Sequence, residues 1–111
     1  MSEMTIDLEK GNGLVPVVIQ DASDKSVLML GYMNEEALQW TRQTGQLHLW
    51  SRSRGKLWLK GEQSGNHLLV KRLALDCDGD ALLAEVEPET GETPVCHTGA
   101  ETCFFRDLSF K

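Results

Sequence analysis

The distribution of apolar and polar residues predicts a chain of short β-strands. Apolar or alternating runs recur between polar segments, which is the pattern of strands joined by turns. The predicted strands span residues 14–20, 27–32, 46–50, 57–59, 68–75 and 81–86. The polar segment 21–26 joins the first two as a hairpin, and the irregular tail after Pro88 leaves room for a short strand at 104–108.

One segment has the pattern of a helix. Asn34 is a suitable N-cap, and Glu35 and Glu36 place negative charge at the positive end of the helix dipole. Gly45 suits the position just after the last helical residue. Many short strands with one main helix predict an α+β fold of small, twisted strands.

Composition and charge limit the function classes. The 111 residues are enough for one domain, expected to span 1–111. The sequence shows no signal peptide and no run of about 20 apolar residues, so a cytoplasmic protein that does not enter membranes is expected. The net charge of −6 argues against sequence-independent nucleic-acid binding, although a local basic cluster could still bind a small anion.

The three cysteines point to a metal site. Their odd number and the absence of an export signal favour reduced thiols over disulfides. Cys77, Cys96 and Cys103 could supply three thiolates to a catalytic zinc with one open position. His97 could instead close a structural site or partner a cysteine nucleophile, but it suits a proton carrier best. Burial of the cysteines as small apolar residues is the remaining alternative.

An acidic segment lies between the two last predicted strands. Asp76, Asp78 and Asp80 alternate, so they would share one face of an extended chain, or Asp78-Gly79 could form a tight turn. Crowded carboxylates favour a hard cation such as Mg²⁺. Ala81 stands where a calcium-binding loop requires glycine, which excludes an EF-hand. An acidic turn open to water is the simpler alternative.

Two further segments carry candidate ligand-binding groups. Arg52 and Arg54 alternate with serines, an arrangement suited to phosphate, although a solvated turn would look the same. The loop that follows contains two glycines and the polar residues Lys60, Glu62 and Ser64, and could equally be a plain hairpin loop. His48 and His67 are expected to be structural or surface residues. Trp40, Trp50 and Trp58 are expected in the core or at an interface.

Taken together, the motifs resemble phosphoribosyl-AMP cyclohydrolase, an enzyme family of histidine biosynthesis. The resemblance covers about residues 14–108. The segments that carry it are Ser51-Arg52-Ser53-Arg54, the run LWLKGEQSGN at 57–66, DCDGDALL at 76–83, CHTG at 96–99, and Cys103-Phe104.

The resemblance implies a reaction and its cofactors. Water would add to C6 of the adenine ring of phosphoribosyl-AMP and open the N1–C6 bond, giving the formamidino-imidazole carboxamide ribotide. Zinc, one ion per subunit, would be held by the three cysteines and would make a water nucleophilic at neutral pH. Mg²⁺ would be held by the three aspartates. His97 would be catalytic, and the basic and loop residues would bind substrate.

The resemblance also implies an intertwined homodimer in which zinc ligands come from both subunits. No fused pyrophosphohydrolase domain is expected in this chain. The alternatives are a non-catalytic, zinc-stabilised dimer module and another zinc hydrolase of purine nucleotides, such as a deaminase. The His-x-Glu and Pro-Cys-x-x-Cys motifs of the zinc deaminases are absent.

Overall fold

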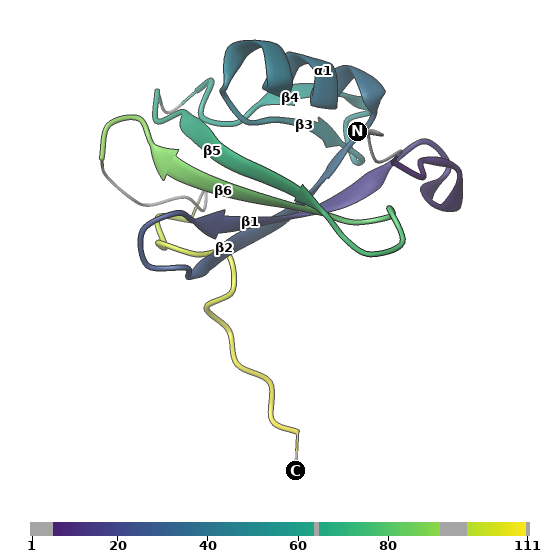
Figure 1. The fold of residues 1–111 in the computed structure, drawn as a ribbon. Coiled ribbons are helices and arrows are strands. Elements are labelled where there is room, and N and C mark those ends of the chain that lie inside the picture. The colour runs from purple at the N-terminus through teal and green to yellow at the C-terminus, as the bar shows by residue number, and fades with distance from the viewer. Residues whose placement is uncertain (1–5, 64, 92–97, 111) are drawn as a thin grey trace.

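A computed structural model describes residues 6–63, 65–91 and 98–110 of the chain. Its elements follow the predicted order, with a short 3₁₀ turn added near the N-terminus (Figure 1). They are η1 (Glu9–Gly11), β1 (Val15–Asp21), β2 (Val27–Met33), α1 (Glu35–Thr44), β3 (His48–Ser51), β4 (Lys56–Leu59), β5 (Leu68–Leu75) and β6 (Leu82–Pro88). The α+β prediction is confirmed. No helix in the described residues is long and apolar enough to cross a bilayer.

The main sheet has four strands in the order β2-β1-β6-β5. The predicted hairpin of β1 and β2 is antiparallel, and so is the pair β5 and β6. Between them, β1 and β6 run parallel although some sixty residues separate them in the sequence. The β3–β4 hairpin forms a second, two-stranded sheet, and α1 lies beside it on one side of the main sheet (Figure 1).

Helix α1 begins and ends where the sequence predicts. The Asn34 side chain accepts a hydrogen bond from the Ala37 N–H at 2.9 Å, and Gly45 adopts a left-handed conformation with φ of 75°. Ala37 and Thr41 are buried. The Thr41 hydroxyl accepts a bond from the His48 N–H at 2.9 Å, which ties the helix to β3.

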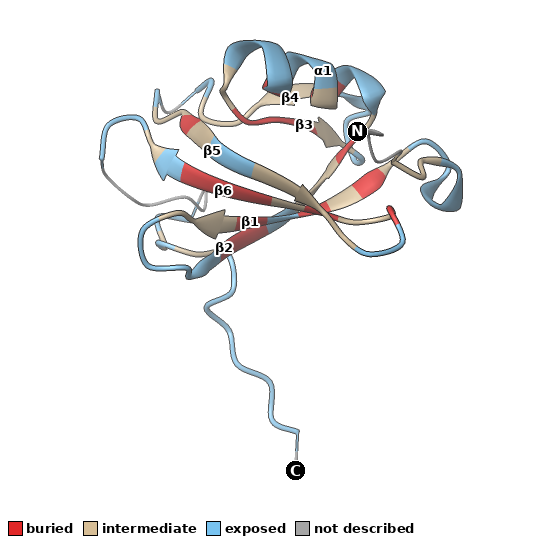
Figure 2. Cartoon of the chain, in the orientation of Figure 1, coloured by how far each residue is buried: buried red, intermediate tan, exposed pale blue. Residues whose placement is uncertain are grey.

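The buried core lies between the main sheet and the layer formed by α1 and β3 (Figure 2). Alternate residues of β1 point into it because successive side chains of a strand face opposite ways. The core residues are Val15, Val17, Ile19, Leu28, Met29, Met33, Ala37, Leu47, Leu49, Leu68, Leu82, Ala84 and Val86. Val18, on the other face, is 36% exposed, and its partner across the sheet, Leu30, is 46% exposed.

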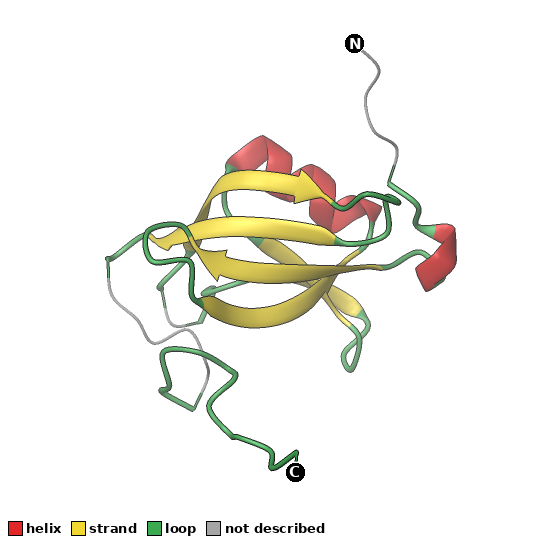
Figure 3. Ribbon diagram, turned by 60° about the horizontal axis from the view of Figure 1, so that its bottom comes forward, coloured by secondary structure: helices red, strands yellow, loops and turns green. Residues whose placement is uncertain are grey.

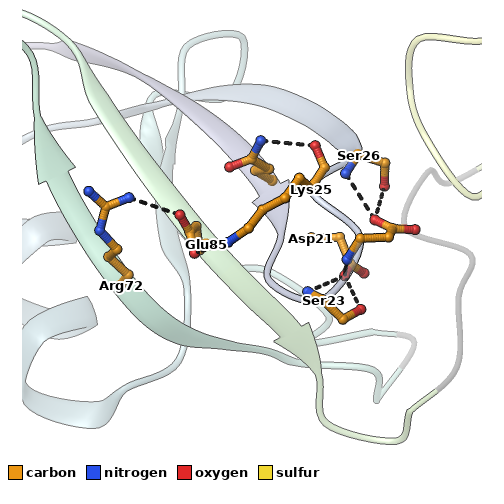
Figure 4. A network of polar contacts seen from close by, with 8 residues as sticks. Asp21, Ser23, Lys25, Ser26, Arg72 and Glu85 are labelled. Atoms are coloured by element: carbon orange, nitrogen blue, oxygen red, sulfur yellow. Dashed lines mark hydrogen bonds and ion pairs between the residues drawn. The ribbon is translucent and has the colours of Figure 1, made fainter.

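One charged network is partly buried on the sheet (Figure 4). Glu85 of β6 accepts from Lys25 Nζ and from an Arg72 guanidinium nitrogen, each at 2.9 Å, and its side chain is only 11% exposed. Lys25 belongs to the β1–β2 turn, in which Asp21 accepts from the Ser23 N–H and hydroxyl. The network therefore connects the turn to β6 and β5.

The C-terminal segment differs from the prediction. Residues 104–110 carry no strand, so the short strand that the sequence left possible at 104–108 does not form. The segment leaves the sheet and projects away from it (Figure 3). Apolar residues alone do not make a strand, because a strand also needs a neighbouring chain edge for its hydrogen bonds. Phe104, Phe105, Leu108 and Phe110 are 50–93% exposed.

Candidate functional site

The acidic residues lie in the turn that joins β5 to β6, here called the acidic turn (residues 76–80). Asp76 Oδ1 accepts the backbone N–H groups of Asp80 at 2.9 Å and of Ala81 at 3.2 Å. Gly79 has a φ of 80°, which favours glycine. The turn interpretation is therefore correct, and the extended alternative is wrong.

The acidic turn brings its carboxylates together. One oxygen from each of Asp76, Asp78 and Asp80 lies within 4.8 Å of the others. Two oxygens bound to one Mg²⁺ at about 2.1 Å are at most about 4.2 Å apart. Small side-chain rotations would therefore fit the three oxygens around one hard cation.

Lys10 of η1 contacts the same carboxylates. Its Nζ is 3.2 Å from Asp80 Oδ2 and 3.6 Å from Asp78 Oδ2. The Asp7 N–H also donates to the Gly79 carbonyl at 2.7 Å, which holds the N-terminal segment against the turn. A hydrogen bond with Asp80 raises the pKa of Asp78, whereas the same bond and Lys10 lower the pKa of Asp80. The main cause of the raised pKa of Asp78 is thus the neighbouring Asp80 carboxyl group.

The described cysteines do not meet in one chain. Cys77 is exposed in the acidic turn, and Cys103 is exposed where its N–H donates to the Leu28 carbonyl of edge strand β2 at 2.7 Å. Figure 1 shows the acidic turn and the start of the C-terminal segment at opposite ends of the sheet. Burial as small apolar residues is therefore wrong for these two cysteines. Cys96 and His97 lie outside the described residues.

A hollow of about 240 Å³ lies between β2 and the β3–β4 hairpin. It is lined by Ser51 at the end of β3, by Arg52 and Ser53 in the turn that follows, and by Tyr32 and Trp58. Arg52 Cζ lies 3.9 Å from the centroid of the Tyr32 ring. The hollow thus combines a cationic group and two hydroxyls with aromatic walls, a set of groups that suits a phosphorylated ligand.

The other predicted ligand-binding residues lie close to Trp58 or farther along the loop. Arg54 Cζ is 5.8 Å, and Lys60 Nζ 5.3 Å, from the centroid of the Trp58 ring. Glu62 is exposed and does not line the hollow. Ser64 lies outside the described residues. A Cβ on Gly61 would be 2.3 Å from the Asn66 carbonyl oxygen, so this loop has its shape only with glycine there.

The predictions for the tryptophans and for the other two histidines can be compared with the structure. None of the three tryptophans is fully buried, but Trp58 packs against the core. Trp50 and Trp58 line the hollow, and Trp40 is 45% exposed on α1. His48 is buried and bonded to the Gln46 carbonyl, and His67 contacts the Glu89 carboxylate at 3.0 Å.

Sequence reasoning missed two residues at these sites. Tyr32 ends an apolar run and looks like any other strand residue, and Lys10 stands in a segment with no recognisable element. Each reaches its site through a contact between segments far apart in the chain. No local signal in the sequence identifies either one.

The comparisons with known proteins establish the family. The family model for phosphoribosyl-AMP cyclohydrolase matches residues 29–105. The chain belongs to this family. The matched range contains the acidic turn, Arg52 and Arg54 of the turn after β3, and all three cysteines.

Curated relatives are similar to this protein over most of the chain. A phosphoribosyl-AMP cyclohydrolase of Lacticaseibacillus paracasei is 52% identical, over 93% of this chain and 91% of the relative. One of Solibacter usitatus is 54% identical over 95% of this chain and 82% of the relative. One of Cenarchaeum symbiosum is 52% identical over 93% of each. A cyclohydrolase is a hydrolase, so this chain is an enzyme and the alternative of a non-catalytic dimer module is wrong.

Proposed function

We propose that the chain hydrolyses phosphoribosyl-AMP in histidine biosynthesis by adding water to C6 of the adenine ring and opening the N1–C6 bond. The observation that carries this proposal is the family match, which spans every segment with candidate chemistry. The product is the formamidino-imidazole carboxamide ribotide. Water attacks the ring carbon C6, and the departing ring nitrogen N1 gains a proton.

We assign Mg²⁺ to the acidic turn. Hard oxygen ligands suit this ion, and Asp76, Asp78 and Asp80 already place their oxygens close to one another. The backbone bonds to Asp76 fix one carboxylate, while the side chain of Asp78 is 58% exposed and can reorient. A cation held there would help to bind the substrate's phosphate groups.

We assign Zn²⁺ to Cys77, Cys96 and Cys103. Thiolates suit zinc, which when bound would make a water molecule nucleophilic near neutral pH. A zinc–sulfur bond is about 2.3 Å long, so cysteines at opposite ends of one sheet cannot share an ion. The separation of Cys77 from Cys103 thus supports a site with ligands from two subunits. His97 would be the acid–base group beside the zinc.

Exposed apolar surface supports the homodimer. Val18 and Leu30 are cross-strand neighbours on the outer face of the sheet, and both are substantially exposed. The aromatic residues Phe104 and Phe105 directly follow Cys103 and are also exposed. A second copy of the chain would cover these side chains and at the same time bring a second set of cysteines.

Arg52 and Arg54 would bind phosphate. Both arginines come from the turn between β3 and β4, and Arg54 and Lys60 both lie near the Trp58 ring. Bidentate bonds from arginine to phosphate are strong and directional. Lys60, Glu62 and Ser64 are proposed to contact the rest of the substrate.

The direct test measures zinc and turnover in cysteine variants. Purified protein should hold about one zinc per chain and convert phosphoribosyl-AMP, with a rise in absorbance from the ring-opened product. Cys96→Ala and Cys103→Ala should each lose both zinc and turnover, whereas Ser109→Ala, an exposed change in the same tail, should lose neither. Full activity in either cysteine variant would refute the zinc assignment.

Mixing two inactive variants tests the shared site. If ligands come from both subunits, a heterodimer of Cys77→Ala and Cys103→Ala chains has one site with all cysteines and one with two missing. Random pairing should then restore about a quarter of the wild-type activity. No recovery after denaturation and joint refolding, with heterodimers verified by mass spectrometry, would place each site within one chain.

A further inference from the structure

Tyr32 and Arg52 meet at the wall of the hollow although twenty positions separate them. Tyr32 lies near the end of β2, and Arg52 is in the turn between β3 and β4. The guanidinium carbon is 3.9 Å from the ring centroid, well inside the range of about 6 Å for a cation–π contact. Both residues line the hollow.

The close approach of β2 to β3 makes this contact possible. A Cβ on Gly31 would lie 3.0 Å and 3.1 Å from the two terminal carbons of Leu49, which is tighter than ordinary packing. Leu49 is buried in the core, so it has little room to yield. Gly31 therefore lets the strand that carries Tyr32 lie near the strand that leads to Arg52.

The contact leaves the binding groups of Arg52 available. A guanidinium has its N–H donors in its plane, at the edge, whereas a cation–π contact uses its face. An exposed arginine in a turn would otherwise lose much rotamer freedom when it binds an anion. The Tyr32 ring can restrict the side chain without competing for the anion.

We propose that Tyr32 is a positioning residue that holds Arg52 in the orientation needed to bind a phosphate group of the substrate. This inference rests on the phosphate-binding role proposed for Arg52. The aromatic ring is what matters, and the tyrosine hydroxyl is not required.

The test compares two substitutions of Tyr32 by steady-state kinetics with phosphoribosyl-AMP. Tyr32→Leu should raise KM about two- to fivefold with kcat nearly unchanged, which is the effect expected for one exposed cation–π contact. Tyr32→Phe should retain the wild-type KM. If circular dichroism shows that the leucine variant does not fold, Tyr32→Met takes its place. Trp40→Leu removes an exposed aromatic residue away from the hollow and should leave KM unchanged.

A double-mutant cycle separates positioning from a merely structural role. Arg52→Ala should raise KM at least about tenfold, and Tyr32→Leu should add nothing in that background. An additive effect of Tyr32→Leu, or a raised KM in Tyr32→Phe, would overturn the inference. If Arg52→Ala raises KM but Tyr32→Leu does not, the inference on Tyr32 fails alone. If Arg52→Ala leaves KM unchanged, the proposed role of Arg52 fails, and the inference fails with it.

Discussion

Two groups of acidic residues in this protein differ in how their charge is balanced. Glu85, on the sheet, receives one hydrogen bond from Lys25 and one from Arg72, so two cations surround one carboxylate (Figure 4). In the acidic turn one cation faces several carboxylates, because Lys10 contacts Asp78 and Asp80, with Asp76 beside them.

The difference separates a stabilising network from a candidate binding site. The Lys25 and Arg72 contacts lower the pKa of Glu85, so its charged form is favoured in the folded protein. In the acidic turn, the pKa of Asp78 is raised because a second carboxylate lies next to it. Excess negative charge that the chain does not neutralise is available to a divalent cation.

The largest expected effect comes from neutralising one carboxylate of the acidic turn. Asp78→Asn should reduce Mg²⁺-dependent activity at least about tenfold, the range seen when groups around a metal are altered. The backbone N–H groups of Asp80 and Ala81 donate to Asp76 rather than to Asp78, so the turn keeps these bonds and the melting temperature should not fall. Asp107→Asn, in the exposed tail, is the control. Unchanged Mg²⁺ dependence of turnover would contradict the assignment of the ion.

Glu85→Gln should show the opposite pattern. Its melting temperature should drop by a few degrees because Lys25 and Arg72 lose a shared, largely buried anion, while activity and Mg²⁺ dependence should persist. Glu87→Gln is a matched control, since the Glu87–Lys71 pair is about half exposed on both sides. Equal melting temperatures for the two variants would show that the Glu85 network adds no special stability.

The pH dependence of stability should distinguish the same two regions. Because the folded-state pKa of Glu85 lies below 4.5, its contribution is complete above pH 4.5 and is lost as the pH falls through the folded pKa. For Asp78, whose folded-state pKa lies above 3.8, the cost of charge is present at neutral pH and disappears in acid. The difference in melting temperature between wild type and Glu85→Gln should therefore disappear below pH 4.5. A difference that stays constant into acid would exclude the ion pairs as its cause.

The smallest effect concerns Lys10. Its ammonium lies against the carboxylates that would bind a cation, so Lys10→Met should tighten Mn²⁺ binding by a few-fold at low salt. Mn²⁺ titration followed by electron paramagnetic resonance measures this without turnover. Lys71→Met, which removes an equal charge from β5, should change the affinity less. Weaker binding in Lys10→Met would show that Lys10 supports the site rather than competing with the ion.

The sequence by itself determined the local elements of this protein. The cap at Asn34 and the glycine at Gly45 define α1, and turn residues separate the strands, because these signals act within a few residues. The acidic turn could also be predicted from the sequence, since its three aspartates lie close together in the chain. The family resemblance, read from motifs in order, was confirmed by the comparisons.

Only the tertiary structure decided how distant segments meet. The parallel pairing of β1 with β6, the Lys10 contact with the acidic turn and the Tyr32–Arg52 contact all join residues far apart in sequence. The exposed tail, where the sequence left a short strand possible, also depends on the tertiary structure, because a strand needs a neighbouring chain edge. Such contacts depend on which surfaces the folded core leaves adjacent, and this depends on the packing of the whole chain rather than on any local pattern.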